Sequence, residues 1–249
     1  MTNTYKIAEL NIRIHSLYEE VHLLCADYMA AEGEPDFAVE TTRADIEFER
    51  ERSAKEDKRE GIPIRHFSDS YLETLAVYRK IAEKIPEYDA LLFHGSCVAV
   101  DSEGYLFTAK SGTGKSTHTR LWREQFKERA VMVNDDKPII RIKDGSVIIY
   151  GTPWDGKHRL STNIAVPLKA ICFLTRAEKN WISPMSRSEA YPVLLQQAYR
   201  PFDKKALGKT LLLIDRLTSE VGLWKLGCNT DPEAALVAYE AMAAGWRIV

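Results

Sequence analysis

The chain has 249 residues, of which 45% are hydrophobic and 28% charged, and its formal net charge is −2. This length and composition are typical of a folded protein with one large domain or two small ones. The small net charge argues against bulk electrostatic capture by nucleic acid or by an anionic membrane. No apolar run approaches the ~20 residues that cross a bilayer, and the N-terminus lacks the profile of a signal peptide. We therefore expect a cytoplasmic protein that binds neither nucleic acid nor membrane.

The first third of the chain predicts a small N-terminal α/β lobe over residues 1–88. The hydrophobic pattern predicts a strand over residues 5–14, a helix over 17–31, a strand over 37–42 and a helix from Asp69 to near Pro86. Residues 43–60 are densely charged with both signs. We interpret this stretch as a solvated connector, with an exposed strand and a mobile loop, and a binding arm is the alternative.

Residues 89–249 are predicted to form a second domain that contains strands and helices. The expected strands lie over residues 90–100, 105–109, 131–133, 139–142, 147–150, 170–174 and 223–226. The expected helices lie over residues 118–130, 188–199, 204–217 and 231–244. Residues 143–146, Lys-Asp-Gly-Ser, predict a hairpin turn between two of the strands.

A glycine-rich segment joins the strand at 105–109 to the helix that follows it. Its residues are Ser111, Gly112, Thr113, Gly114, Lys115, Ser116 and Thr117. Glycines let successive backbone N–H groups curl round a phosphate, and the helix N-terminus adds unpaired donors and partial positive charge. Lys115 can reach the β- and γ-phosphates, and the Ser116 hydroxyl can ligate Mg²⁺. The sequence therefore predicts a phosphate-binding loop of the Walker A type, with Ala109 where the general pattern has glycine.

Two adjacent carboxylates, Asp135 and Asp136, follow the apolar strand over residues 131–133. A carboxylate at a strand end can hold the Mg²⁺ that bridges two phosphates, or accept a proton from an attacking hydroxyl. The two side chains cannot point the same way if the segment stays extended. The alternative is an aspartate-rich turn before the hairpin.

Several other residues have both a functional and a structural interpretation. His94 lies before the loop, where a strand histidine is more often structural. The cluster Lys157, His158 and Arg159 could contact a transferring phosphate or an anionic substrate, or form a solvated charge run. Trp122 and Trp154 could stack on a ligand, although core packing is the default. Residues 208–210 also spell Gly-Lys-Thr, but no strand or glycine-rich run precedes them, so a second phosphate site is not expected.

Three segments resemble, in order, the catalytic domain of HPr kinase/phosphorylase: Phe93-His94-Gly95, residues 109–116 and Val133-Asn134-Asp135-Asp136. That family has a His-Gly before the loop, a loop of the form Gly-x-Ser-Gly-x-Gly-Lys-Ser, and an Asp-Asp pair after the next strand. The resemblance covers residues 90–150. It implies the phosphoenolpyruvate carboxykinase-type P-loop fold, an α/β fold with a mixed sheet, here preceded by the small N-terminal lobe.

The resemblance also implies roles for the matching residues. The loop and Lys115 would hold ATP. Ser116 and one of the two aspartates, which we take to be Asp135, would hold Mg²⁺. The other aspartate, Asp136, would be the base that takes the proton from a serine hydroxyl, and His94 would lie beside this base and orient it. The sequence alone leaves the assignment between the two aspartates open.

We therefore expect an ATP-dependent, Mg²⁺-requiring kinase that transfers the γ-phosphate to a hydroxyl, that of a serine in a peptide or small protein. Small proteins that resemble HPr kinase also occur as tailoring kinases for peptides made in biosynthetic clusters and as kinases of free serine. Two alternatives are a kinase of a free amino acid or other small metabolite, and a nucleotide-sensing module without transfer. A closed pocket lined by Lys157, His158 and Arg159 would favour a metabolite. The acceptor, the nucleotide and the oligomeric state stay open.

Overall fold

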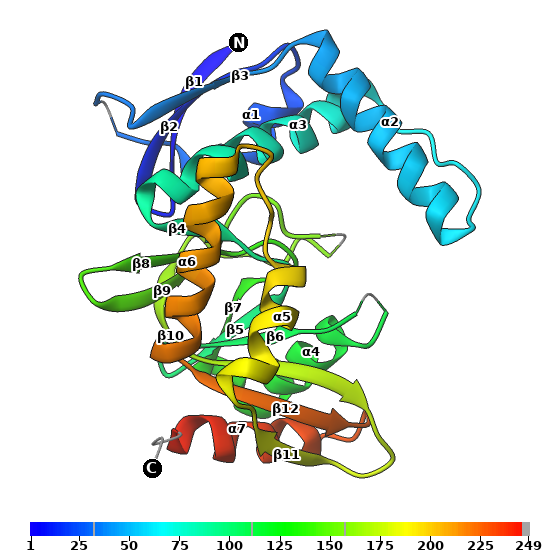
Figure 1. Ribbon diagram of the computed structural model, residues 1–249, viewed down its shortest axis with the longest axis vertical. Helices are drawn as coiled ribbons and strands as arrows, with labels where there is room; N and C mark the ends of the chain where they lie inside the picture. Colours follow the sequence, from blue (N-terminus) through cyan, green and yellow to red (C-terminus); the bar gives the residue numbers. More distant parts are fainter. Residues whose placement is uncertain (32, 111, 157, 246–249) are drawn as a thin grey trace. The chain divides into compact units, whose positions relative to one another are not determined.

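The computed structural model describes residues 1–249 except 32, 111, 157 and 246–249 (Figure 1). It divides into two compact units, Met1–Lys84 and Ile85–Val249. The boundary predicted from the sequence lies between residues 88 and 89. Among the described helices, none has the length and apolar character needed to cross a membrane.

The first unit contains a three-stranded sheet and helices that follow or connect its strands (Figure 1). Its elements are β1 (Thr2–Ile7), β2 (Leu10–His15), α1 (Glu20–Leu24), the 3₁₀ turn η1 (Ala26–Tyr28), β3 (Phe37–Glu40), α2 (Arg43–Glu60) and α3 (Asp69–Lys84). Strands β1 and β2 pair antiparallel, and β2 and β3 pair parallel. The buried side chains of this unit include Tyr5, Ile12, Ile14, Val21 and Leu72.

Two predictions for this unit are wrong in detail. Residues 5–14 are not one strand, because the chain turns at Ala8 and Glu9, whose φ angles are 51° and 61°. Such a tight hairpin turn usually carries Asn or Gly, so the Ala-Glu pair hides it from a sequence search. The helix predicted over residues 17–31 is confined to α1 and the short turn η1. The strand over 37–42 and the helix from Asp69 are confirmed as β3 and α3.

The prediction of a connector over residues 43–60 is also wrong, because this stretch is the 18-residue helix α2. Thr42 and Asp45 form a capping box at its start, and Gly61 ends it in the left-handed conformation. Charges of opposite sign lie three or four residues apart, as in the pairs Glu47–Arg50 and Glu51–Lys55. A helix that is polar all round is stabilised by such pairs, and its lack of an apolar stripe explains the error.

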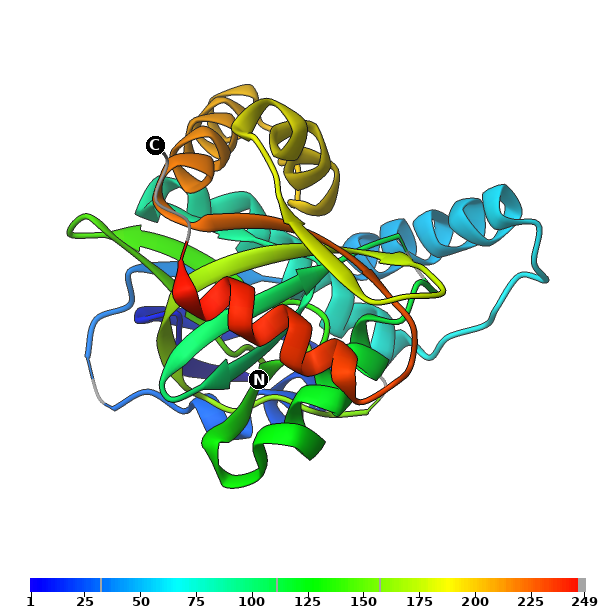
Figure 2. The same ribbon diagram turned by 90° about the horizontal axis from the view of Figure 1, so that it is seen from below.

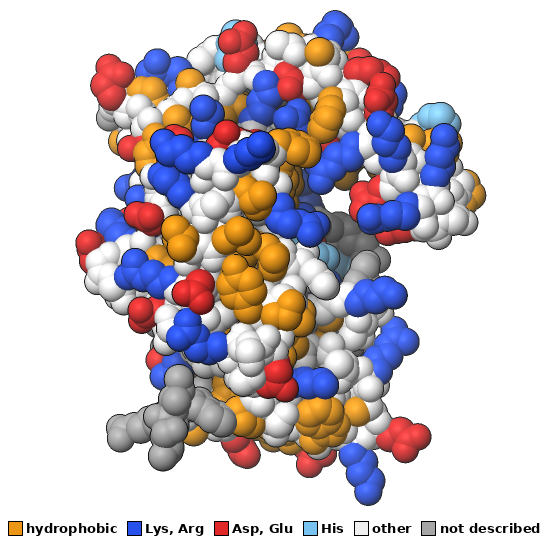
Figure 3. Space-filling model, in the orientation of Figure 1, with side chains coloured by type: hydrophobic (Ala, Val, Ile, Leu, Met, Phe, Trp, Pro, Cys, Tyr) orange, Lys and Arg blue, Asp and Glu red, His pale blue; other side chains and the backbone are white. Residues whose placement is uncertain are grey.

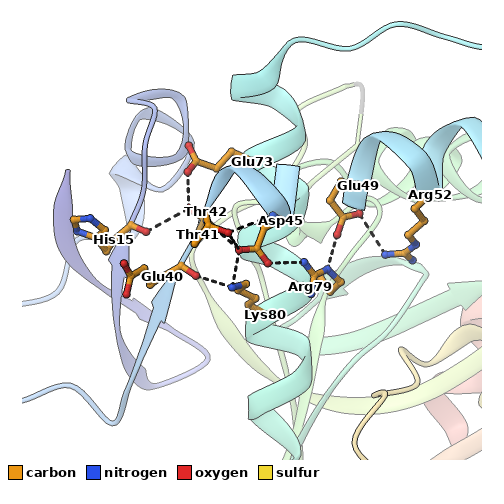
Figure 4. A network of polar contacts seen from close by, with 10 residues as sticks. All are labelled: His15, Glu40, Thr41, Thr42, Asp45, Glu49, Arg52, Glu73, Arg79 and Lys80. Carbon is orange, nitrogen blue, oxygen red and sulfur yellow. Dashed lines mark hydrogen bonds and ion pairs between the residues drawn. The ribbon is translucent and has the colours of Figure 1, made fainter. Parts of the chain in front are cut away.

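A buried ionic network joins α2 to α3 (Figure 4). The Arg79 Nε lies 2.5 Å from the Glu49 Oε1, and its Nη2 lies 3.1 Å from the Asp45 Oδ1. Lys80 Nζ lies 2.9 Å from the other Asp45 oxygen. Burial raises the pKa of Asp45, but hydrogen bonds from Lys80, Thr42 and Arg79 outweigh this effect and lower the pKa to about 2. The network therefore keeps the carboxylate ionised inside the unit.

The second unit contains a nine-stranded mixed sheet with the order β4-β8-β9-β10-β6-β5-β7, in which β12 pairs with β10 and β11 with β12. Its strands are β4 (Ala90–Leu92), β5 (Ser96–Val100), β6 (Glu103–Thr108), β7 (Ala130–Asn134), β8 (Ile139–Lys143), β9 (Ser146–Tyr150), β10 (Ala165–Arg176), β11 (Trp181–Pro184) and β12 (Gly222–Cys228). Its helices are η2 (Ile85–Tyr88), α4 (Lys115–Phe126), η3 (Lys127–Arg129), α5 (Arg187–Gln197), α6 (Lys204–Glu220) and α7 (Glu233–Ala244). Strand β10 pairs parallel with β6 and β12 and antiparallel with β9, so the sheet is mixed as predicted.

Helices cover both faces of this sheet (Figure 2). Leu194 of α5 and Ile214 of α6 pack in one buried cluster with Leu106 of β6. Trp122 of α4 packs in the other cluster with Phe107, the next residue of β6, and with residues of α7. Successive strand residues point to opposite faces, so β6 contributes to both cores. Strand β6, in the buried middle layer of three, therefore leads into the predicted phosphate loop.

Most of the predicted elements of this unit are confirmed, and the exceptions have local causes. The strand predicted over residues 90–100 breaks at 93–95 into β4 and β5, which pair with different neighbours. Helix α4 begins earlier than predicted, at Lys115. Strand β11 was not predicted, because Trp181–Pro184 is short and contains proline. The hairpin turn is confirmed, with Asp144 and Gly145 at φ angles of 49° and 78°.

An apolar patch lies on the outer side of the second unit (Figure 3). Hydrophobic side chains gather there over α6, where Leu212 is 72% exposed.

The segment 208–210 also lies in α6, and the Thr210 hydroxyl donates to the Ala206 carbonyl within the helix. The Gly-Lys-Thr sequence there is therefore part of a helix and not a phosphate loop, as expected.

Removal of Arg79 should destabilise the first unit strongly. Arg79→Ala leaves the Glu49 carboxylate, which is 2% exposed, without its closest cation. We expect a loss of about 3–5 kcal/mol in the free energy of unfolding, measured by urea denaturation of the full chain. The matched control is Arg52→Ala, because Arg52 pairs with the same carboxylate at 3.5 Å from a half-exposed position. It should cost less than about 1 kcal/mol, and equal effects of the two variants would contradict the assignment.

Candidate functional site

The predicted phosphate loop joins the end of β6 to the start of α4. Gly112 and Gly114 have φ angles of 76° and 123°, which L side chains rarely adopt. Gly114 is the N-cap, and its carbonyl accepts the first helical hydrogen bond, from the His118 amide. A Cβ placed on Gly112 would meet nothing within 4 Å, so the loop backbone is open on that side. The loop therefore has the glycine geometry of an anion cradle at a helix N-terminus, although Ser111 lies outside the described residues.

Lys115 is the first residue of α4, and its ammonium lies close to the loop backbone. The Nζ donates to the Ala109 carbonyl at 3.3 Å, and no described carboxylate lies within ion-pair distance of it. Burial lowers the pKa of Lys115, and the negative charges of Asp136 and Asp135 oppose this effect. The ammonium is thus partly desolvated, near two carboxylates but paired with neither.

The two aspartates lie at the end of β7 and occupy different surroundings. Asp135 is 7% exposed, and its Oδ1 accepts a hydrogen bond from the Ser96 hydroxyl at 2.6 Å. Asp136 is half-buried; its Oδ1 lies 3.3 Å from the His94 Nε2 and its Oδ2 2.9 Å from the Lys137 Nζ. The two side chains therefore face different partners, and they do so from a bend that follows β7 rather than from an extended strand.

The pairing of β5 with β7 brings Ser96 and His94 close to the two aspartates. The two strands run antiparallel, with Cys97 opposite Asn134, and the Gly95 amide donates to the Asp136 carbonyl at 3.1 Å. The residues just before β5 therefore lie next to the residues just after β7. A Cβ on Gly95 would lie 3.0 Å from the Phe107 carbonyl oxygen and 2.8 Å from the Leu106 side chain, so this crossing disfavours a larger residue.

His94 is held at both ring nitrogens. Its Nδ1 lies 3.1 Å from the Gln197 Oε1, and its backbone amide donates to the Gln197 carbonyl at 2.9 Å. Burial raises the pKa of Asp136, but the hydrogen bond from His94 and the charge of Lys137 outweigh it and lower the pKa to about 2. Asp136 is therefore an oriented, ionised carboxylate.

Sequence reasoning missed three polar residues that complete this region. The Ser96 hydroxyl also lies 3.0 Å from the Thr119 Oγ1, so it links the Asp135 carboxylate to α4. Asn134 is fully buried, and its Oδ1 accepts from the amides of Asp136 and Lys137. These roles depend on contacts between strands and helices that are far apart in sequence, so no local pattern marks them.

Asp155 is the third missed residue and adds a carboxylate near Asp135. It is 7% exposed and accepts a hydrogen bond from Ser161 at 3.2 Å. Burial raises the pKa of Asp155, Arg159 and Ser161 oppose this, and the charge of Asp135 adds to the rise. Asp155 is carried by the loop between β9 and β10, which Asn134 holds through its amide bonds to the carbonyls of residues 152 and 154.

The basic cluster predicted as a substrate site is only partly described. Lys157 lies outside the described residues, and His158 and Arg159 are exposed. The Arg159 Nε lies 3.8 Å from the Asp155 Oδ1. Trp154 is 7% exposed and Trp122 is fully buried, so both belong to the core rather than to an open stacking surface.

A pocket of about 410 Å³ adjoins the loop. Loop residues form one wall, and the ends of β10 and β12 form the other. Arg176, at the end of β10, donates to the Gly112 carbonyl at 2.7 Å and to the Thr113 carbonyl at 3.5 Å. This arginine fixes the outer part of the loop to the sheet.

The site suits Mg²⁺ held partly by a bound phosphate. Among the described residues, no group of three or more His, Cys, Asp or Glu side chains is arranged to hold a metal ion. Mg²⁺ bound with phosphates commonly takes one or two protein carboxylates and keeps several waters. Asp135 fits this role, since its Oδ2 has no hydrogen-bond partner among those residues.

The comparisons identify one family model and a distant solved structure. A model described as SynChlorMet cassette protein ScmC matches residues 64–212, which include the loop, His94 and all three aspartates. No curated protein matches the chain. The Hpr(Ser) kinase/phosphatase from Coxiella burnetii is similar over 62% of this chain and 99% of its own, with a TM-score of 0.33 and 12% identity. A TM-score of this size says nothing about the site.

The close contact at Gly151 gives a first prediction for this region. A Cβ there would lie 1.9 Å from the Thr162 carbonyl oxygen and 2.7 Å from that of Val133. Gly151→Ala should therefore destabilise the chain by more than about 3 kcal/mol and shift the loop that carries Asp155. The control is Gly208→Ala in α6, where a Cβ meets nothing within 4 Å and the change should stabilise by about 0.5–1 kcal/mol. Melting curves that rank the two variants the other way would contradict the packing.

The pKa of Asp136 gives a second prediction. Its folded value of about 2 lies below the ordinary 3.8, so the ionised side chain stabilises the fold above the ordinary value. This stabilisation is lost as the pH falls through the folded value. The difference in unfolding free energy between wild type and Asp136→Asn should be constant above about pH 5 and shrink toward about pH 3. Glu128→Gln, which removes an exposed carboxylate, is the control for the loss of one negative charge. A pH-independent difference for Asp136→Asn would contradict the low pKa.

Proposed function

The chain belongs to the family described as SynChlorMet cassette protein ScmC, and because this name states no activity, we propose its function from the geometry of the site. We propose an ATP-dependent, Mg²⁺-requiring kinase that transfers the γ-phosphate to a hydroxyl, that of a serine in a peptide or small protein. The phosphoenolpyruvate carboxykinase-type P-loop fold and the separate N-terminal lobe belong to this proposal. The following observations support it.

The triphosphate is bound by the loop and Lys115. The open glycine backbone and the helix N-terminus provide N–H donors, and the Lys115 ammonium has no carboxylate partner of its own among the described residues. A partly buried cation that is paired with no described carboxylate gains most when an anion arrives. The loop therefore favours a multiply charged phosphate over a neutral ligand.

Asp135 and Ser116 would hold Mg²⁺ beside this phosphate. The ion would supply positive charge to the phosphate oxygens. The protein's own contribution is orientation, because the Ser96 hydroxyl holds one oxygen of Asp135 at 2.6 Å and leaves the other for a ligand. The buried Asp155 adds negative charge near Asp135, which favours binding of a cation there.

The single observation that carries the kinase proposal is the contact of Asp136 with His94. A module that only senses nucleotide has no need for a carboxylate oriented by a second side chain. Asp136 accepts the hydrogen of the acceptor hydroxyl, and His94 and Gln197 fix its orientation. The hydroxyl is thus aligned while the phosphoryl group is held by the loop.

The exposure of His158 and Arg159 favours a peptide over a small metabolite. A metabolite site is normally a concave pocket that covers most of its ligand. Basic side chains on an open loop suit an extended, acidic acceptor. The acceptor is therefore proposed to be a serine in a chain that approaches from this loop.

Phosphoryl transfer tests the proposal directly. The full chain is incubated with labelled ATP, Mg²⁺ and either serine-containing peptides or free serine. We expect labelled peptide from the wild type, loss of nucleotide binding in Lys115→Ala, and weaker Mg²⁺-nucleotide binding in Asp135→Asn. Asp136→Asn should bind nucleotide normally and lose about 10²–10⁴-fold in turnover.

The matched control is Lys110→Ala, which removes an exposed lysine five residues from Lys115. It should keep nucleotide affinity and turnover. Clean nucleotide binding with no transfer to any serine acceptor would refute the kinase and leave a nucleotide sensor. Transfer to free serine alone would refute the peptide acceptor and retain the chemistry.

A further inference from the structure

The pocket beside the loop contains a polar group that the proposed transfer does not use. The pocket is lined by Gly112, Gly114 and Thr117 on the loop side, and by Leu174, Arg176 and Cys228 on the sheet side. Its volume of about 410 Å³ lies in the usual range of small-molecule sites. Loop residues form one wall of this pocket, so a ligand bound in the pocket lies directly beside the loop.

His118 is one of the residues that line this pocket, and it is 2% exposed. It lies one turn into α4, where its Nε2 accepts the indole N–H of Trp122 at 3.0 Å. An indole nitrogen can only donate, so the His118 Nε2 carries no proton. The proton of the neutral ring is therefore on Nδ1.

The Nδ1 of His118 has no hydrogen-bond partner in the described part of the chain. Buried N–H groups almost always have an acceptor, and leaving one unpaired costs free energy. The ring is held in place, because it packs edge-to-face against Phe107 with centroids 4.6 Å apart and its Nε2 accepts the Trp122 N–H. An acceptor that reached the ring from the pocket would satisfy this N–H group.

Resting on the proposed triphosphate at the loop, we propose that this pocket holds the nucleoside of that triphosphate, and that the His118 Nδ1–H donates to one of its acceptor atoms. Nucleosides carry such acceptors as ring nitrogens, base carbonyls and ribose oxygens. The apolar wall at Leu174 suits the faces of a base, and Asn229 and Thr230 place polar groups at the rim. His118 thus recognises the part of the nucleotide that the loop does not touch.

Cys228 provides a direct reporter of occupancy. It lines the pocket and is partly accessible, whereas Cys25, Cys97 and Cys172 are fully buried. Maleimide should therefore label Cys228 first in the native full chain. ATP with Mg²⁺ should slow this labelling about tenfold or more, whereas tripolyphosphate with Mg²⁺, which lacks the nucleoside, should leave the rate nearly unchanged. Ribose 5-triphosphate, which lacks the base, shows whether the ribose or the base protects Cys228 from labelling.

The role of His118 is tested by comparing two ligands on the same variants. His118→Phe keeps the ring and removes the donor, and it should weaken ATP binding about tenfold while tripolyphosphate binds as in the wild type. Because this change also leaves the Trp122 N–H unpaired, a second variant is needed. Cys228→Trp fills the pocket from the sheet side, leaves both members of the His118–Trp122 pair in place, and should show the same selective loss, measured by calorimetry.

The outcomes separate the two proposals. Lys115→Ala should lose both ligands. If the wild type binds neither ATP nor tripolyphosphate, the proposed function fails and the nucleoside site fails with it. If ATP binds and both pocket variants bind it as tightly as the wild type, the proposed function survives. The nucleoside site is then refuted, and the His118 Nδ1–H serves only the fold.

Discussion

The candidate site depends on the side chain of Asn134. Its Oδ1 accepts the amides of Asp136 and Lys137, and its Nδ2 donates to carbonyls of the loop between β9 and β10. The side chain is fully buried, so each of these bonds would be costly to lose. One amide thereby fixes the turn that carries two carboxylates and the loop that carries Asp155. Three acidic side chains from two separate stretches of sequence come together because of Asn134, for which we propose no chemical role.

The register of β5 against β7 then gives the adjacent aspartates different neighbours. Ser96 meets Asp135, and His94 meets Asp136, because the start of one strand lies opposite the end of the other. Two equal partners would have left two equivalent carboxylates. Instead, Asp135 is buried, and one of its oxygens accepts from a neutral hydroxyl. The negative charge of Asp136 is offset by Lys137 and by the hydrogen bond from His94. This difference supports the proposed division between metal ligand and base.

The extent to which the sequence predicted these features follows from how local each signal is. The glycine turn and the pair Asp135-Asp136 are each contiguous, so a pattern of neighbouring residues was enough to single them out. Most strands and helices of the second unit were found from hydrophobic periodicity. Helix α2 was missed because it has no apolar stripe, although Thr42 and Gly61 carry capping signals at its ends. Asp155 and Asn134 acquire their positions at the site only from contacts between segments far apart in the chain, which no spacing in the sequence reveals.

The charges around Lys115 explain how an acidic pair can lie beside the proposed site for a polyanion. The Lys137 ammonium contacts Asp136 at 2.9 Å and offsets its charge, so this carboxylate repels an incoming phosphate less than a bare one would. Lys115 has no such contact with any carboxylate of the described residues, and burial lowers its pKa, so its ammonium gains most when an anion arrives. Lys137 is therefore paired with a carboxylate of the protein, whereas Lys115 is available to the proposed ligand. If Lys115 were paired and Lys137 were not, the unpaired ammonium would lie beside Asp136, the proposed base, and the loop would lack a cation for the proposed phosphate.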